Sequence, residues 1–255
     1  MLVRRRQGRD LRRGPDELIV EEPMEIRLDD HLVTTTMRTP GNDYELAVGF
    51  CVAEGLLAAA PVTGVRYCAN GSAMASAFNV VTVETGGRAP VPRARLTTTT
   101  SSCGLCGSAS IEEMQARLAP LTGLATFDLD VLTAVPDRVR AEQSLFDATG
   151  GVHAAATFDA EGRIGLVRED VGRHNAVDKV VGRLRLDGAL PAGQLGLFVS
   201  GRASFELVQK AWAAGFAAMV AVSAPSALAV EAARTAGITL VGFVRGDDLN
   251  VYAPA

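Results

Sequence analysis

Short apolar segments alternate with amphipathic ones through the C-terminal half of this 255-residue chain, and this alternation limits the fold more than any other feature. It predicts elements in the order αββαβαβαβ, followed by a closing strand. In sequence, these elements are 137–145, 153–158, 163–169, 173–185, 195–200, 203–214, 219–223, 226–236, 238–244 and 250–253. Such alternation predicts a three-layer α/β domain with a largely parallel sheet, which we expect to occupy residues 109–255.

The residues before this domain are rich in β-branched side chains and turn residues. They predict a smaller, mostly β subdomain over 15–100 that contains one helix. Its strands are expected at 18–21, 24–28, 32–37, 65–69 and 78–84. The helix follows Gly41, with Asn42 as its N-cap and Glu45 placed to complete a capping box. Residues 1–14 contain six arginines and predict a basic, disordered tail.

Charge and hydropathy exclude two classes of protein. The chain has 25 basic and 29 acidic residues, a formal net charge of −4, whereas a general nucleic-acid binder needs a basic face. No uncharged apolar run approaches the roughly 18 residues of a membrane span. The N-terminal arginines are followed by Gly14, Pro15 and Asp16 rather than by the apolar core of a signal peptide. We therefore expect a cytoplasmic protein.

A Cys-x-x-Cys motif, formed by Cys103 and Cys106, follows six consecutive hydroxyl residues at 97–102. Hydroxyl residues and neighbouring glycines do not suit the interior of a strand or helix, so we expect a mobile loop over 101–108. A helix over 109–118 is expected to begin just after it, and the dipole of that helix favours the thiolate form of Cys106. On spacing alone, the motif fits sulfur transfer, redox chemistry and metal binding equally well.

The order of the predicted elements resembles the cytidine deaminase-like fold, in which a β-hairpin feeds three strand–helix units. Deaminases of this fold carry zinc ligands in H-x-E and P-C-x-x-C motifs at two helix starts. Here those positions hold 172–175 (GRHN) and 200–204 (SGRAS), which contain no thiol. The other two cysteines, Cys51 and Cys68, are isolated and are expected in the core. We therefore expect no metal held by protein side chains.

Three helices of the α/β domain are predicted to start at the carboxyl ends of strands, the edge where open α/β sheets bind ligands. Helix N-termini offer unpaired N–H groups to phosphate, and arginines add bidentate contacts. The candidate anion-binding residues are Arg173, His174, Ser200, Gly201, Arg202 and Ser226. For His174 a purely structural role stays equally open, and for His31 and His153 the structural role is favoured.

Six segments spread over nearly the whole chain, beyond the arginine-rich start, together carry a family resemblance. They are 40–50 (PGNDYELAVGF), 101–107 (SSCGLCG), 146–155 (FDATGGVHAA), 169–179 (EDVGRHNAVDK), 200–204 (SGRAS) and 242–246 (GFVRG). In this order they resemble the FdhD family of formate dehydrogenase accessory sulfurtransferases. Jointly they are far more specific than the Cys-x-x-Cys spacing.

The resemblance implies a sulfur carrier. Such a protein accepts sulfane sulfur from a cysteine desulfurase as a cysteine persulfide. It passes the sulfur to the molybdenum cofactor, in the bis(molybdopterin guanine dinucleotide) form, before that cofactor is inserted into formate dehydrogenase. The resemblance also implies a cytoplasmic homodimer without nucleic-acid or membrane partners. Cys103 is expected to carry the persulfide, and Cys106 to assist.

The guanine end of that cofactor is expected to contact the end of the penultimate strand and the turn after it. The candidate residues are Gly242, Phe243, Val244, Arg245, Gly246, Asp247 and Asp248. A carboxylate of Asp247 or Asp248 can accept both N1–H and N2–H of guanine, while Arg245 can meet a phosphate or stack on the base. A plain turn between two strands is an equal alternative from local sequence alone.

Two other functions remain compatible with these residues. One is a non-catalytic chaperone that binds the cofactor, with the cysteines serving as a gate or metal clip. The other is a thiol-disulfide oxidoreductase, which is disfavoured because a run of hydroxyl residues, rather than a strand, precedes the Cys-x-x-Cys motif.

Overall fold

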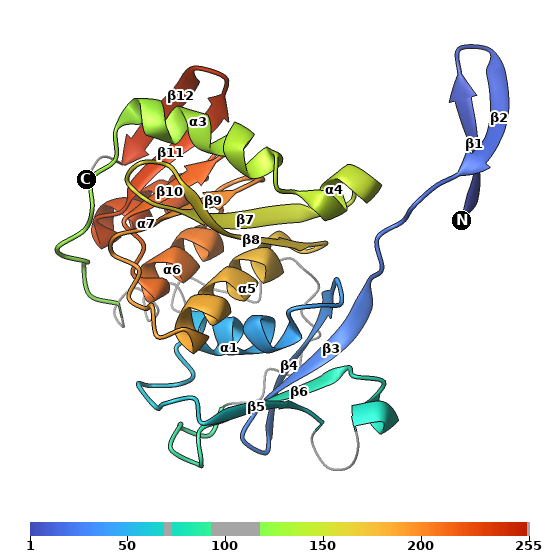
Figure 1. The fold of residues 1–255 in the computed structure, drawn as a ribbon. Helices are drawn as coiled ribbons and strands as arrows, with labels where there is room; N and C mark the ends of the chain where they lie inside the picture. The colour runs from blue at the N-terminus through green and yellow to red at the C-terminus, as the bar shows by residue number, and fades with distance from the viewer. Residues whose placement is uncertain (69–72, 93–117, 254–255) are drawn as a thin grey trace.

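The structure is a computed structural model that describes residues 1–68, 73–92 and 118–253 (Figure 1). Its larger part is built on a six-stranded sheet with the order β12-β11-β10-β9-β7-β8. These strands are β7 (His153–Phe158), β8 (Ile164–Asp170), β9 (Gly196–Val199), β10 (Ala218–Ala221), β11 (Thr239–Arg245) and β12 (Asp248–Ala253). Only β9, β10 and β11 are parallel, and the strands on either side of them are antiparallel. The sheet is therefore mixed rather than largely parallel.

Helices cover both faces of this sheet, which confirms the three-layer α/β architecture (Figure 1). One layer contains α5 (Arg173–Leu186), α6 (Phe205–Ala214) and α7 (Ala227–Ala236), and the other contains α3 (Leu129–Arg140). Alternate side chains of each strand serve the two layers, as the two-residue period of a strand requires. In β9, for example, Leu197 and Val199 pack towards α5 to α7 and Phe198 packs towards α3.

The region predicted as one helix over 137–145 forms two helices instead. Asp128 caps α3 by accepting a hydrogen bond from the Asp130 backbone N–H, and the helix continues past an interior Pro136. Residues Leu132, Val135 and Val139 are fully buried at helical spacing, so packing against the sheet overrides the proline. A separate short helix, α4 (Ser144–Thr149), follows. None of the described helices is long and apolar enough to cross a membrane.

A four-stranded sheet with the order β4-β3-β6-β5 forms the smaller N-terminal part, together with α1 (Asp43–Ala53) and the short 3-10 helix η1 (Ala73–Ser76). Its strands are β3 (Glu22–Leu28), β4 (His31–Arg38), β5 (Gly64–Tyr67) and β6 (Val80–Glu84). The mostly β subdomain with a helix is therefore present, but the predicted strand over 18–21 is absent.

The start of α1 does not use the predicted capping box. Asn42 adopts a left-handed conformation with φ of 56° and makes no side-chain cap. Instead, the buried guanidinium of Arg38 pairs with the buried carboxylate of Asp43, which also accepts the N–H of Gly41. Glu45 accepts two hydrogen bonds from Arg168 of β8, at 2.5 and 2.8 Å. Glu45 is therefore engaged by a distant partner, Arg168, instead of closing the local capping box.

The two parts of the molecule are joined by close packing of α1 on α5, which lie side by side in Figure 1. A Cβ atom added to Gly49 would lie 1.8 Å from the carbonyl oxygen of Asp178, and one added to Gly182 would lie 1.8 Å from that of Glu45. Each helix therefore needs glycine where the other backbone approaches. The buried Lys179–Asp170 ion pair, at 2.8 Å, lies beside this contact, and Lys179 also donates to the Thr39 carbonyl.

The first 15 residues form a β-hairpin, so the prediction of a disordered basic tail is wrong. Strands β1 (Leu2–Gln7) and β2 (Asp10–Pro15) pair antiparallel along their whole length. The turn between them includes Gly8 at φ of 64°. The hairpin projects away from the rest of the molecule (Figure 1).

Candidate functional site

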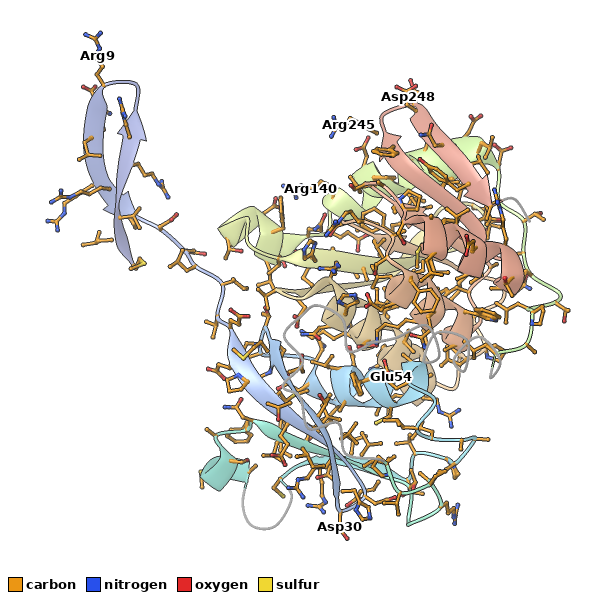
Figure 2. The ribbon with its side chains drawn as sticks, turned by 180° about the vertical axis from the view of Figure 1, so that it is seen from behind. Arg9, Asp30, Glu54, Arg140, Arg245 and Asp248 are labelled. Carbon is orange, nitrogen blue, oxygen red and sulfur yellow. The ribbon has the colours of Figure 1, made fainter. Side chains whose placement is uncertain are left out.

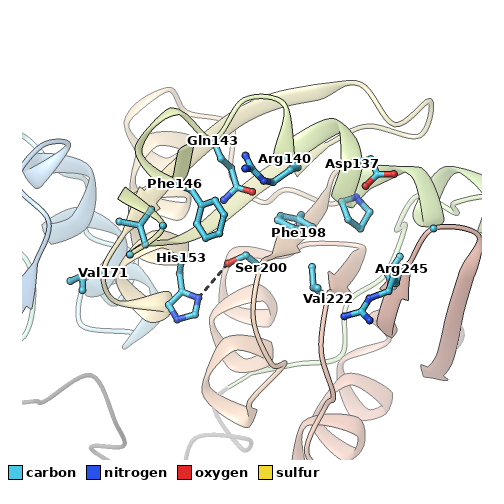
Figure 3. Close-up of a pocket in the computed structure, with 16 residues that line it drawn as sticks. Asp137, Arg140, Gln143, Phe146, His153, Val171, Phe198, Ser200, Val222 and Arg245 are labelled. Carbon is cyan, nitrogen blue, oxygen red and sulfur yellow. Dashed lines mark hydrogen bonds between the residues drawn. The ribbon is translucent and has the colours of Figure 1, made fainter. Parts of the chain in front are cut away.

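A cavity of about 620 Å³ opens at the carboxyl edge of the three parallel strands (Figure 3). Residues that follow or end these strands form one wall: Ser200 after β9, Val222 after β10, and Val244, Arg245 and Gly246 at the end of β11. The opposite wall comes from α3 and α4. The volume falls in the range of small-molecule sites, and the position is the one at which open α/β sheets bind ligands.

His153 and Ser200 meet on the cavity wall because β7 runs antiparallel to β9, so that β7 begins where β9 ends. The Nδ1 atom of His153 lies 3.4 Å from Oγ of Ser200, and this Oγ accepts the backbone N–H of Ala154 at 2.9 Å. The Ser200 hydroxyl can donate to Nδ1 of one ring tautomer or accept from Nδ1–H of the other, so the contact engages Nδ1 in either case.

Burial lowers the pKa of His153, and the neighbouring Arg173 and His174 lower it further. The imidazole is therefore uncharged at neutral pH, able to donate one hydrogen bond and to take up a proton when an anion arrives. The sequence favoured a structural role for this residue. The signal that points to the site is its place after Gly150 and Gly151, which also line the cavity.

Two arginines and the ring of Phe146 also stand on the cavity walls (Figure 3). Arg140 of α3 lies over the ring of Phe146, with its Cζ atom 4.8 Å from the ring centroid, and pairs with Asp147 at 2.6 Å. Arg245 is exposed at the end of β11. Among the described lining residues, Asp137 supplies the one carboxylate. The walls therefore offer cations for phosphate and a ring for a base.

Only some of the residues predicted to contact guanine line the cavity. Val244, Arg245 and Gly246 line the cavity, whereas Asp247 in the turn and Asp248 at the start of β12 are exposed and are not lining residues. Gly242 packs against Pro225, Ser223 and Tyr252, and Phe243 is half exposed at a φ of 54°. A bulge in the pairing of β11 with β12, between Gly242 and Arg245, accompanies this change of direction.

Of the six residues predicted to bind an anion, Ser200 lines the cavity and the other five do not. Ser200 lines the cavity, while Ser226 is occupied as the cap of α7 and accepts the N–H of Ala229 at 3.2 Å. His174 pairs through Nε2 with Glu206 at 3.1 Å, and Arg202 is exposed. None of Ser226, His174 and Arg202 contributes to the described lining.

Arg173 and Gly201 lie next to His153 but are not among the residues that line the cavity. A Cβ atom added to Gly201 would lie 3.5 Å from Cε1 of His153 and 4.0 Å from Cδ of Arg173. The Nε atom of Arg173 is buried and has no hydrogen-bond partner within the described part of the chain. Because an unpaired buried donor is costly, this atom is a candidate ligand contact.

Of the thiols, the structure describes Cys51 and Cys68. Burial raises the pKa of Cys51 to about 12, with Asp178 and Glu54 adding to the effect, so this core thiol is protonated. Cys68 is only half-buried and accepts a hydrogen bond from Arg66 at 3.3 Å, so its prediction as a core residue is wrong. Within the described ranges, His, Cys, Asp and Glu form no group of three suited to a metal ion. Cys103, Cys106 and the predicted helix over 109–118 lie outside the described residues, apart from residue 118.

The family model and the curated relatives that match this chain carry the same family name. The chain matches the model of the FdhD/NarQ family over residues 19–255. It is 50% identical to a Streptomyces avermitilis protein named sulfur carrier protein FdhD, over 94% of this chain and 88% of that protein. A Mycolicibacterium paratuberculosis protein of the same name is also 50% identical, over 94% of this chain and 91% of its own length.

The fold has a counterpart among solved structures. A crystal structure described as that of a formate dehydrogenase accessory protein from Desulfotalea psychrophila superposes with a TM-score of 0.79. The match covers 99% of this chain and 95% of that one, at 22% identity. The family match over almost all of the chain, together with half-identical relatives over most of their length, establishes that this chain belongs to the FdhD/NarQ family.

Proposed function

We propose that this protein is a sulfur carrier that receives sulfur from a cysteine desulfurase on Cys103. It then delivers the sulfur to the molybdenum cofactor, whose bis(molybdopterin guanine dinucleotide) form is its bound substrate, before insertion into a formate dehydrogenase. The related proteins named sulfur carrier protein FdhD support the sulfur chemistry. We place the protein in the cytoplasm as a homodimer, with the desulfurase and the formate dehydrogenase as its partners.

The observation that carries this proposal is the cavity at the carboxyl edge of the sheet. Arg140 and Arg245 can bind phosphate oxygens, Phe146 offers a stacking surface, and His153 can hydrogen-bond an anion. A cavity of about 620 Å³ matches one nucleotide end of the substrate rather than the whole dinucleotide. The remainder of the substrate would extend beyond the cavity mouth.

The sulfur steps balance without a net change of oxidation state at loading. The Cys103 thiolate attacks the outer sulfur of the desulfurase persulfide; a new S–S bond forms and the desulfurase thiolate leaves. In delivery, the Cys106 thiolate can attack Sγ of Cys103, which releases the outer sulfur as hydrosulfide and forms the Cys103–Cys106 disulfide. A cellular thiol must then reduce that disulfide before the next cycle.

Mass spectrometry after incubation with a desulfurase and free cysteine tests the sulfur step. The wild-type chain should gain about 32 Da per sulfane sulfur, and Cys103→Ala should not. Cys68→Ala is the matched control, because Cys68 is the more accessible of the two described thiols and is expected to leave the adduct intact. An adduct that persists in Cys103→Ala, together with normal formate dehydrogenase activation, would refute the assignment.

Calorimetry with nucleotides tests the cavity and separates the carrier from a chaperone that only binds the cofactor. Guanosine diphosphate should bind more tightly than adenosine diphosphate, by roughly 1–3 kcal/mol for one charge-assisted contact. Arg245→Ala should weaken both nucleotides, while the exposed Arg163, which pairs with Asp159, provides a matched control as Arg163→Ala. Guanine-selective binding without any sulfane adduct would favour the chaperone.

A further inference from the structure

The N-terminal hairpin has two unlike faces. Directly opposed residues of an antiparallel pair share a face, so the pairs Leu2–Pro15, Arg4–Arg13 and Arg6–Leu11 define one of them, here called the outer face. Val3, Arg5, Arg12 and Gly14 lie on the reverse face. The two faces differ in how their charges are satisfied.

On the reverse face the arginines have carboxylate partners and the small residues are partly covered. Arg5 pairs with Asp16 at 2.5 Å, and Arg12 lies 3.8 Å from Asp10. Val3 and Gly14 are half-buried. Nothing on this face calls for a further partner.

The outer face is exposed throughout. Arg4 and Arg13 stand directly opposite each other without a carboxylate partner in the described part of the chain. Leu2 and Leu11 flank them and are 70% and 61% exposed. Like charges directly opposed across two strands destabilise a hairpin, and an isolated two-stranded hairpin is marginal in water. An acidic surface that also covers leucine side chains would satisfy both features of this face.

The rest of the chain has the complementary charge. Residues 1–15 contain six arginines and one aspartate, a formal charge of +5, whereas the whole chain carries −4. The remaining 240 residues therefore carry −9. Yet the hairpin projects away from its own body, with Arg9 at the far end (Figure 2). A nucleic acid would match the arginines but would leave the leucines uncovered.

We propose that the outer face of the hairpin docks on the acidic body of a second copy of this chain. In a two-fold dimer, each copy gives its hairpin to the other, so one small contact is made twice. This doubling brings a 15-residue element closer to the area that a stable interface buries. The resemblance implied a homodimer, and this inference assigns to it a contact made by residues that precede the region matched by the family model.

Two substitutions at neighbouring positions of the full chain test the proposal, one on the outer face and one on the reverse face as its control. Arg13→Glu places an opposite charge across from Arg4 on the outer face, and Arg12→Glu does the same across from Arg5 on the reverse face. Both change the net charge by the same amount, and both convert a like-charge pair into an attractive one. We expect Arg13→Glu to weaken self-association at least about tenfold in analytical ultracentrifugation, and Arg12→Glu less than about threefold.

A photo-crosslinking residue tests the contact directly. Placed at Leu11, it should give crosslinked dimers that contain both chains when nitrogen-14 and nitrogen-15 labelled proteins are mixed, whereas at Arg12 it should not. Equal self-association of the two glutamate variants, a monomeric wild-type chain, or crosslinks only within one chain would each overturn the proposal. Loss of DNA binding in Arg13→Glu with unchanged self-association would identify a nucleic acid as the partner instead.

Discussion

The Nδ1 atom of His153 lies 3.4 Å from Oγ of Ser200, at the junction where an antiparallel strand meets the parallel part of the sheet. The serine hydroxyl is held by the backbone N–H of Ala154, so its proton can be directed towards the imidazole. This arrangement engages Nδ1 of the imidazole with the serine hydroxyl. An anionic ligand bound beside this imidazole would favour its protonated form.

We predict that nucleoside diphosphate binding takes up a proton at His153. The pKa of the free protein's His153 is lowered by burial and by the nearby Arg173 and His174, and a bound phosphate raises it again. Affinity should therefore increase as the pH falls from neutral towards the lowered pKa of the free protein's His153, by about tenfold for each pKa unit regained. Calorimetry in two buffers of different ionisation enthalpy measures the proton uptake. His153→Gln should abolish it, and an unchanged uptake in that variant would remove His153 from the site.

A second prediction concerns the carboxylate that recognises guanine. Asp137 lines the cavity, whereas Asp247 and Asp248 do not. Asp137→Asn should therefore reduce the preference for guanosine over adenosine diphosphate by about 1.5–3 kcal/mol, the range for a hydrogen bond to a charged group. The matched controls Asp247→Asn and Asp248→Asn should retain the preference. The opposite pattern in competition calorimetry would restore the role that the sequence predicted for the turn.

A third prediction concerns the buried ion pair between α5 and α6. The ammonium of Lys210 lies 2.8 and 2.9 Å from the two carboxylate oxygens of Asp178. Burial would lower the pKa of Lys210, but Asp178 and Glu54 reverse this and raise it. Lys210→Met leaves the carboxylate buried without its cation and should cost about 3–5 kcal/mol in urea denaturation. The double variant Lys210→Met/Asp178→Leu should recover much of that loss, and a wild-type midpoint for the single variant would contradict the prediction.

A fourth prediction tests the close approach of α1 and α5. The added methyl of Gly49→Ala would lie 1.8 Å from the Asp178 carbonyl oxygen, so the helices must separate. The free energy of unfolding should fall by about 1–3 kcal/mol or more, the range for overpacking. Gly193→Ala serves as control, because its Cβ would meet nothing nearer than 3.6 Å. Equal thermal midpoints for the two variants would show that the helix pair can adapt.

Local patterns in the sequence predicted most of the elements within a few residues. The helix predicted at 173–185 is α5, Arg173–Leu186, and the strand predicted at 153–158 is β7. The errors fall where distant partners decide the outcome. Burial of Leu132 and Val139 stabilises α3 despite the proline at position 136. Glu45 forms hydrogen bonds with Arg168 instead of the predicted capping box.

The candidate site was predicted less completely than the fold. Ser200, Val244, Arg245 and Gly246 do line the cavity, but His153, Arg140 and Asp137 were not predicted there. These three come from β7 and α3, which precede the strand–helix units in which the sequence predicted the site. The roles of Cys103 and Cys106 stay predictions.

The sequence by itself determined the alternation of strands and helices, because a period of 2 or 3.6 residues is a local property of the chain. It also determined the family, through motifs that keep their order along the chain. Only the tertiary structure decided which residues meet. The order β12-β11-β10-β9-β7-β8 places β7 beside β9, and so brings His153 to Ser200 across 47 residues of sequence. Such pairing depends on the burial of the whole sheet between its two helical layers, and no local pattern encodes that free energy.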